Sequence, residues 1–253
     1  MPSGTIHTEE QVLTVHEIMT LYEASGSSIT IPQKEVFRYL GYRGISPDDA
    51  VLSRISDCVQ TLMRESRPRS VWARYPLALS APKEPSDKAQ APADEISIPG
   101  LRFSSRQLAK NLQGCSCVVL MAATIGPGAD FLIRRAEAIS MVDAAIYQAA
   151  GAAMAEAWCD EVNRRIISAM KEQSLFPRPR FSPGYGDVPL SLQKDFSALL
   201  QMPSTCGISL TDTLLMVPGK SVTAFIGFSE KPQPCILEGC EACSNQNHCA
   251  YRR

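Results

Sequence analysis

Positions 180–189 read RFSPGYGDVP, a stretch that combines two prolines, two glycines, an arginine, a tyrosine and an aspartate. Glycine permits positive φ angles and close approach of the backbone, whereas proline fixes φ and removes a backbone donor. A long alanine-rich segment precedes the stretch, and a run typical of strands follows it. We therefore expect a shaped loop between rigid elements, where binding sites are often built; an ordinary helix-to-strand connection is the simpler interpretation.

The segment before this loop is predicted to be helical over residues 131–172, as two helices. The second helix, Met141–Met170, carries many alanines, which permit another element to pack closely against it. Glu156 and Asp160 lie four residues apart and therefore share one face of this helix. A solvated helix face is the simplest interpretation of that pair.

Residues 115–124, CSCVVLMAAT, form a short apolar run that is typical of a buried strand. Cys115 and Cys117 would point to opposite faces of that strand, so we interpret them as core residues rather than joint ligands. The next residues, 125–130, read IGPGAD. A plain turn before a helix explains them better than a phosphate-binding loop, because two glycines in a turn are weak evidence for such a loop.

The rest of the chain is predicted to be mainly helical at its start and mainly extended at its end. Before residue 115, apolar periodicity and turn residues predict helices over 9–24, 34–40, 46–63 (with Ser46 as the N-cap) and from 104 or 105 to 112, and extended segments over 71–79 and 96–98. After the loop, they predict a helix over 190–200, an extended segment over 208–213 and two strands around Pro218-Gly219.

This order of elements predicts an α+β fold with a mainly antiparallel sheet, long packed helices, a helical N-terminal region and a cysteine-rich C-terminal tail. Residues 81–95 lack periodicity and are expected to form a linker or mobile loop. They separate residues 1–80 from a main domain over residues 96–230, and residues 231–253 form the tail. We expect residues 1–80 to pack onto the main domain, because their apolar helix faces need a partner.

The overall composition is that of an ordinary globular protein, with 45% apolar and 20% charged residues among 253. The 25 basic and 26 acidic residues give a net charge of −1, so no overall field favours nucleic acid or an anionic membrane. No apolar run approaches the ~20 residues that a membrane-spanning helix needs, and the first residues lack a secretory signal pattern. We therefore expect a cytoplasmic protein that binds neither nucleic acid nor membrane.

Four motifs occur in order along the second half of the chain. They are Ala155-Glu156-Ala157-Trp158 in the long helix, Arg180-x-x-Pro183-Gly184-Tyr185-x-x-x-Pro189, then Gly207-Ile208-Ser209-Leu210-Thr211-Asp212-Thr213, and finally Met216-Val217-Pro218-Gly219-Lys220-Ser221-Val222. In type and order they resemble the activation (reactivation) domain of cobalamin-dependent methionine synthase, over roughly residues 100–230. The chain also resembles free-standing members of that family, in which the activation module is a separate polypeptide.

The resemblance implies binding of S-adenosylmethionine, the methyl donor that restores methylcobalamin after the cobalt has been oxidised to cob(II)alamin. It assigns Arg180 and Tyr185 to contacts with that ligand, and Glu156 to the ligand amine or to the orientation of Arg180. Asp187 stands where the family often has alanine, and a contact through the backbone would be kept there. The residue types suit these roles, because a guanidinium binds a carboxylate and an aromatic face supports an adenine or a sulfonium.

The C-terminal residues contain a second pattern, Cys235-x4-Cys240-x2-Cys243-x5-Cys249. In a reducing compartment such a cluster indicates metal binding before disulfides, although two disulfides or unliganded thiols remain the alternative. Four thiolates suit either a tetrahedral zinc ion or an iron–sulfur cluster, and the spacing does not choose between them. We favour a cluster, because a protein that serves the reduction of cob(II)alamin has a use for an electron carrier.

Together these patterns predict an accessory component of a methionine synthase (methyltransferase) system. The protein would bind S-adenosylmethionine and support reductive remethylation of cob(II)alamin, with the cobalamin carried by a cobalamin-dependent methionine synthase or another corrinoid protein. A flavodoxin-like or ferredoxin-like electron donor is a further candidate partner. The alternative is a non-catalytic partner-binding or electron-transfer adaptor with a zinc or iron–sulfur tail.

Overall fold

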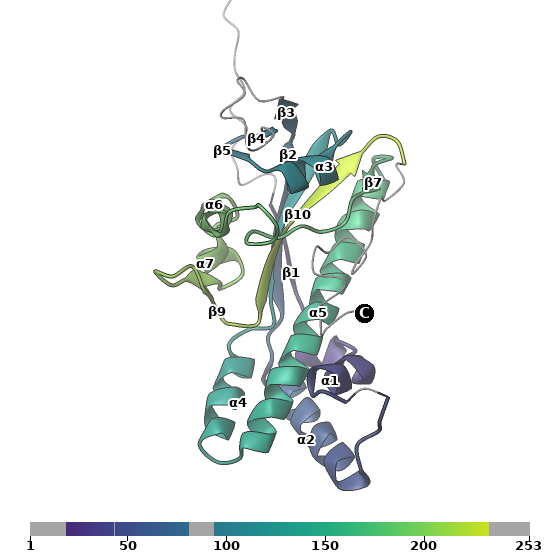
Figure 1. Ribbon diagram of the computed structural model, residues 1–253, viewed down its shortest axis with the longest axis vertical. Coiled ribbons are helices and arrows are strands. Elements are labelled where there is room, and N and C mark those ends of the chain that lie inside the picture. The colour runs from purple at the N-terminus through teal and green to yellow at the C-terminus, as the bar shows by residue number, and fades with distance from the viewer. Residues whose placement is uncertain (1–18, 43, 81–93, 233–253) are drawn as a thin grey trace, which may run out of the picture.

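A five-stranded antiparallel sheet lies at the centre of the protein in the computed structural model (Figure 1). The structure describes residues 19–42, 44–80 and 94–232. The strand order is β1-β2-β6-β10-β7. The strands span Met19–Glu23 (β1), Arg69–Pro76 (β2), Cys117–Thr124 (β6), Phe176–Pro177 (β7) and Ser221–Ser229 (β10).

The central strand of this sheet is β6, which pairs with β2 along one edge and with β10 along the other. All eight of its residues are buried. Val119, Met121 and Ala123 belong to the core on one face of the sheet, and Val118, Leu120 and Ala122 belong to the core on the other. Because side chains alternate between faces, a strand covered on both faces requires an unbroken apolar run, as the sequence of β6 provides.

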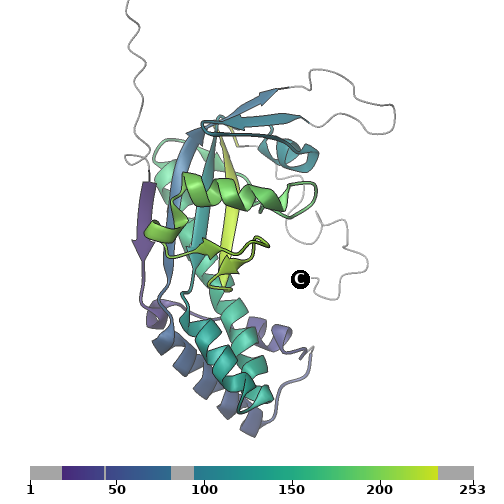
Figure 2. The same ribbon diagram turned by 90° about the vertical axis from the view of Figure 1, so that its left-hand side faces the viewer.

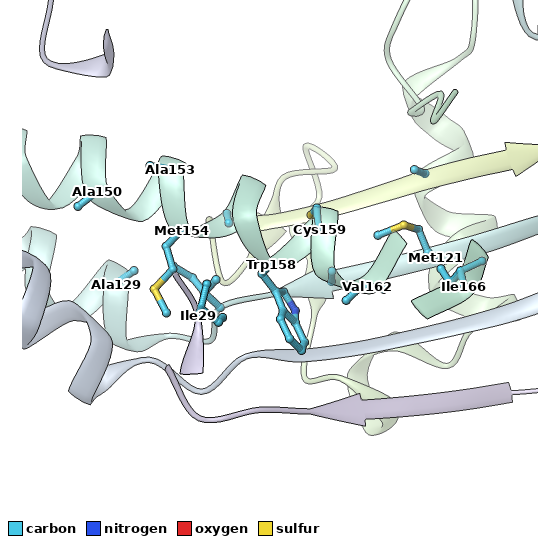
Figure 3. Close-up of a cluster of buried hydrophobic side chains, with 14 of the residues drawn as sticks. Ile29, Met121, Ala129, Ala150, Ala153, Met154, Trp158, Cys159, Val162 and Ile166 are labelled. Atoms are coloured by element: carbon cyan, nitrogen blue, oxygen red, sulfur yellow. The ribbon is translucent and has the colours of Figure 1, made fainter. Parts of the chain in front are cut away.

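Four helices form the core on one face of the sheet, and Figure 1 shows the longest of them, α5, running along the sheet and beyond its end. There α2 and α4 lie beside it, as both views show (Figure 2). Met154 and Trp158 of α5 belong to this core, and Trp158 extends toward the strands (Figure 3). The helices span Gln33–Tyr39 (α1), Asp49–Glu65 (α2), Gly128–Glu137 (α4) and Met141–Lys171 (α5), and a 3-10 turn, η2, spans Gly26–Ser28.

Shorter elements cover the other face, where Phe196, Leu200 and Met202 pack with Phe225 of β10. Three helices contribute, spanning Arg106–Leu112 (α3), Gln193–Leu199 (α6) and Met202–Thr205 (α7), with the 3-10 turn Leu190–Leu192 (η3) before α6. Two small sheets complete the described part of the chain: Ala78–Ser80 (β3), Glu95–Ile98 (β4) and Leu101–Ser104 (β5) form one, and Ser209–Leu210 (β8) and Met216–Val217 (β9) form the other.

The α+β class predicted from the sequence is confirmed, with antiparallel pairing throughout the sheets. Several element boundaries also agree closely, including the long helix α5 and the start of α3 after its N-cap Ser105. The two strands predicted around Pro218-Gly219 exist, but they belong to different sheets: β9 pairs with β8, and β10 pairs with β6. Residues on both sides of the predicted linker contribute strands to the central sheet.

The helix predicted over residues 9–24 is wrong for its described part, because residues 19–23 form the edge strand β1. Pairing with β2 satisfies the backbone of this segment, and the ring of Tyr22 stacks on Trp158 with centroids 5.2 Å apart. Tertiary contacts of this kind override local periodicity. The N-cap prediction is also wrong by two residues: Asp48 rather than Ser46 caps α2, and its Oδ1 accepts from the Val51 N–H at 2.8 Å.

Some predictions concern residues outside the described ranges. These are residues 9–18 of the first predicted helix, residues 81–93 of the predicted linker, and the tail that contains Cys235, Cys240, Cys243 and Cys249.

Candidate functional site

The loop over residues 180–189 lies along the outer edge of β10 and is shaped by backbone hydrogen bonds. The Phe181 N–H donates to the Phe225 carbonyl at 2.9 Å, and the Phe225 N–H donates back at 2.8 Å. Farther along the loop, the Gly184 N–H donates to the Val188 carbonyl at 3.0 Å. Gly184 and Gly186 adopt positive φ angles of 88° and 56°, which glycine permits without strain. The predicted shaped loop is therefore present, and its first residues extend the sheet.

Arg180, at the start of the loop, reaches across to α5 and pairs with Asp160. Its Nη2 atom donates to Asp160 Oδ1 at 2.8 Å. The Arg180 side chain is 24% exposed and that of Asp160 is 61% exposed. The Nη1 atom of Arg180 is sealed from solvent and has no hydrogen-bond partner among the described residues. An unpaired buried donor is costly, so the fold satisfies the guanidinium of Arg180 only in part.

Glu156 lies one turn earlier on α5 and is half-buried. The thiol of Cys159, on the same helix, is buried. Its burial raises its pKa to about 12; the positive charge of Arg180 opposes that rise, and the negative charges of Glu156 and Asp160 add to it. Because Glu156 and Asp160 lie four residues apart on α5, the ion pair of Arg180 with Asp160 brings the guanidinium to the helix face that also carries Glu156. Cys159 is buried in the core beside the sheet, so we interpret it as a packing residue.

Tyr185 lies in the middle of the same loop, with 70% of its surface exposed. Its backbone is fixed, because its N–H donates to the Ser182 carbonyl and its carbonyl accepts from the Val188 N–H. The structure thus places Arg180 and Glu156 at one corner between the loop and α5, and exposes Tyr185 of the same loop to solvent.

Asp187 has a structural role that the sequence did not reveal, because its carboxylate holds the N-terminus of α3. Oδ1 accepts from the Ser105 hydroxyl at 2.5 Å, and Oδ2 accepts from the Arg106 N–H at 2.6 Å. The Gln107 N–H also donates to Oδ1, at 3.2 Å. Partial burial alone would raise the pKa of Asp187, but these hydrogen bonds outweigh it and the pKa is lowered. The loop is therefore tied to α3 through one carboxylate.

We expect Asp187→Asn to lower the free energy of unfolding by about 1 kcal/mol at pH 7, because it removes a charge that helix N-terminal donors stabilise. A carboxyl whose pKa is lowered by folding stabilises the protein above its unfolded pKa, near 3.9, and loses this effect as the pH falls through its folded pKa. The difference between wild type and variant should therefore shrink below about pH 4. Urea unfolding at several pH values measures it.

The exposed Asp212, for which the structure shows no comparable helix contact, provides a matched control: Asp212→Asn should change stability little at any of these pH values. A variant Asp187→Asn that is as stable as wild type at pH 7 would contradict the capping role.

Asp160 is the residue of this corner that sequence reasoning missed. The sequence suggested only a solvated face for Glu156 and Asp160. One signal for a role was available, since four-residue spacing places Asp160 on the same face as Glu156 and therefore toward the same loop.

One hollow of the described surface lies away from this corner. A shallow hollow of about 340 Å³ lies between α1 and α5, lined by Tyr39, Leu40, Ala145, Gln148 and Ala149. Its lining residue nearest to Asp160 along α5, Ala149, is eleven residues away, or about 16 Å at 1.5 Å rise per residue. Within residues 19–42, 44–80 and 94–232, no group of three or more His, Cys, Asp or Glu side chains is placed to hold a metal ion. In the same ranges, no helix combines the length and apolarity needed to cross a membrane.

The sequence matches no protein-family model and no curated protein. Among solved structures, the chain is similar to a crystal structure of the MetH reactivation domain bound to AdoHcy, with a TM-score of 0.61. The two sequences are 17% identical, and the similarity covers 85% of this chain and 79% of that chain. At such low identity the comparison establishes the fold alone. The protein thus shares the fold of the MetH reactivation domain, the structural resemblance that its four sequence motifs predicted.

Proposed function

We propose that this protein binds S-adenosylmethionine at the corner between residues 180–189 and α5, and serves as a reactivation protein for a corrinoid methyltransferase. The observation that carries the proposal is the ion pair of Arg180 with Asp160, which brings the guanidinium to the face of α5 that also carries Glu156, in a fold like that of a domain solved with AdoHcy bound. Opposite charges at this corner suit an amino-acid group, which carries both a carboxylate and an amine.

Each proposed contact follows from a residue's position. Arg180 would bind the ligand carboxylate, and Glu156 would accept from the ligand amine. The ring of Tyr185, exposed on the same loop, would cover the adenine or the sulfonium. Asp187 would support the site without touching the ligand, because its carboxylate fixes the loop to α3.

The protein's contribution to the reaction would be to position and desolvate the methyl donor. A reduced cobalt centre, carried by a cobalamin-dependent methionine synthase or another corrinoid protein, would take the methyl group from the sulfonium and leave S-adenosylhomocysteine. A flavodoxin-like or ferredoxin-like protein would supply the electron that reduces the cobalt beforehand. None of the residues at the corner would need to act as a nucleophile.

We also propose that the cysteine tail holds an iron–sulfur cluster, with zinc as the alternative. Four thiols, Cys235, Cys240, Cys243 and Cys249, are a complete donor set for either. A cluster would supply an electron-transfer centre, and a zinc ion would order the tail. Iron and zinc analysis of anaerobically purified protein distinguishes the two.

Isothermal titration with S-adenosylmethionine tests the ligand proposal. We expect wild type to bind and Arg180→Ala to bind about 10- to 100-fold more weakly, the range for losing a hydrogen bond to a charged group. Arg102→Ala is the control, because Arg102 lies on β5 and pairs there with Glu95. If wild type shows no binding while the tail contains iron, the electron-transfer adaptor becomes the better description of this protein.

A further inference from the structure

Arg180 and Asp160 form an ion pair whose geometry bears on how a ligand would enter the proposed site. Of the two terminal nitrogens of Arg180, Nη1 is sealed from solvent, whereas the hydrogen bond from Nη2 to Asp160 is exposed. A carboxylate that arrives from solvent therefore meets the guanidinium at Nη2, where Asp160 Oδ1 already lies at 2.8 Å. The protein's own carboxylate occupies the most accessible place for a ligand's carboxylate.

We propose that Asp160 is a built-in competitor, which holds Arg180 in the ligand-free protein and is displaced when a ligand carboxylate binds. This inference rests on the proposed function and identifies a residue that sets affinity at the same site. Two carboxylates at one nitrogen repel each other, so ligand and Asp160 compete.

Displacement of Asp160 requires little rearrangement of the fold. The backbone of Asp160 is fixed in the middle of α5, and the backbone of Phe181, next to Arg180, is fixed by its bridge to Phe225. The side chain of Asp160 is 61% exposed, so it can rotate into water, where its charge is solvated. Exposed ion pairs of this kind are weak, and this keeps the competitor displaceable.

A consequence is that Asp160 lowers the affinity of the site for a carboxylate-bearing nucleoside by a small, fixed factor. A role in binding the ligand makes the opposite prediction. If Asp160 instead bound the ligand's amine or sulfonium, its removal would weaken binding. The two roles therefore predict changes of opposite sign.

Titration of wild type, Asp160→Asn and Asp160→Glu with S-adenosylmethionine and with S-adenosylhomocysteine tests the competition. We expect Asp160→Asn to raise the affinity for both ligands about two- to fivefold, the equivalent of one exposed ion pair. Asp160→Glu keeps the competing carboxylate and should bind as wild type does. Both ligands carry the carboxylate and only one carries the sulfonium. Equal gains in affinity for the two ligands would therefore show that Asp160 competes with the ligand carboxylate.

Glu161→Gln is the matched control, because it removes the same charge one residue away, where Glu161 pairs with Arg164 and Arg165 instead. It should leave both affinities unchanged. If wild type binds and Asp160→Asn binds equally or more weakly, the competition is refuted while the proposed function stands. If neither wild type nor Asp160→Asn binds either ligand, the proposed function fails and the competition fails with it.

Discussion

Trp158→Ala is expected to lower the free energy of unfolding by about 3–5 kcal/mol, the range for truncating a large aromatic in a packed core. The side chain is 1% exposed and extends from α5 toward the sheet (Figure 3). It stacks on Tyr22 of β1, and its indole Nε1–H donates to the Arg69 carbonyl of β2 at 3.1 Å. One side chain thus joins the long helix to two strands. Urea unfolding followed by circular dichroism measures the loss.

Trp158→Phe separates the two contributions, since it keeps much of the apolar surface and removes the hydrogen bond. We expect it to cost about 1–2 kcal/mol, for the loss of one hydrogen bond together with a small packing loss. If Trp158→Ala lowered the free energy of unfolding by less than Trp158→Phe does, the packing of α5 on the sheet would not depend on the indole.

The second large effect is expected for Gly128→Ala, with a loss of about 3 kcal/mol in unfolding free energy. A Cβ atom at position 128 would lie 2.2 Å from the Glu65 carbonyl oxygen, which belongs to the backbone at the end of α2 and cannot rotate away. Alanine has the better helix propensity by up to about 1 kcal/mol, which works in the opposite direction. A net loss would therefore show that the close contact between α4 and α2 dominates.

Gly41→Ala is the control for Gly128→Ala. Gly41 has a positive φ of 87°, and a Cβ there would meet no atom within 4 Å. Its replacement should cost only the conformational penalty of about 1–2 kcal/mol. If Gly128→Ala proved as stable as wild type, α4 and α2 would have room to separate without loss of packing.

The parts of the fold that the sequence predicted well are those where one local signal decides the structure. The β6 run has no charged residue, so its burial on both faces of the sheet could be predicted from the sequence alone. The limits of α5 were close to those observed, because Ser140 caps its start and apolar residues recur along its whole length. The shape of the loop followed from its glycines and prolines.

The predictions that failed concern structure that depends on contacts between residues far apart in the chain. Residues 19–23 form a strand because β2 pairs with them, and no property of residues 9–24 alone reveals that partner. Likewise, the ion pair of Arg180 with Asp160 and the cap of Asp187 on α3 join residues that only the fold brings together. The residue types of the candidate site were predictable, and their partners were not.

The position of β6 has a consequence for how this chain is made in the cell. Its two neighbours are β2, which precedes it, and β10, which is the last along the chain of the sheet's described strands. During synthesis, one edge of an uncharged apolar strand stays unpaired until the ribosome has released residues 221–229. Exposed strands of this composition associate readily with one another. The nascent protein is therefore expected to need chaperone protection over this interval, whatever the final stability of the folded state.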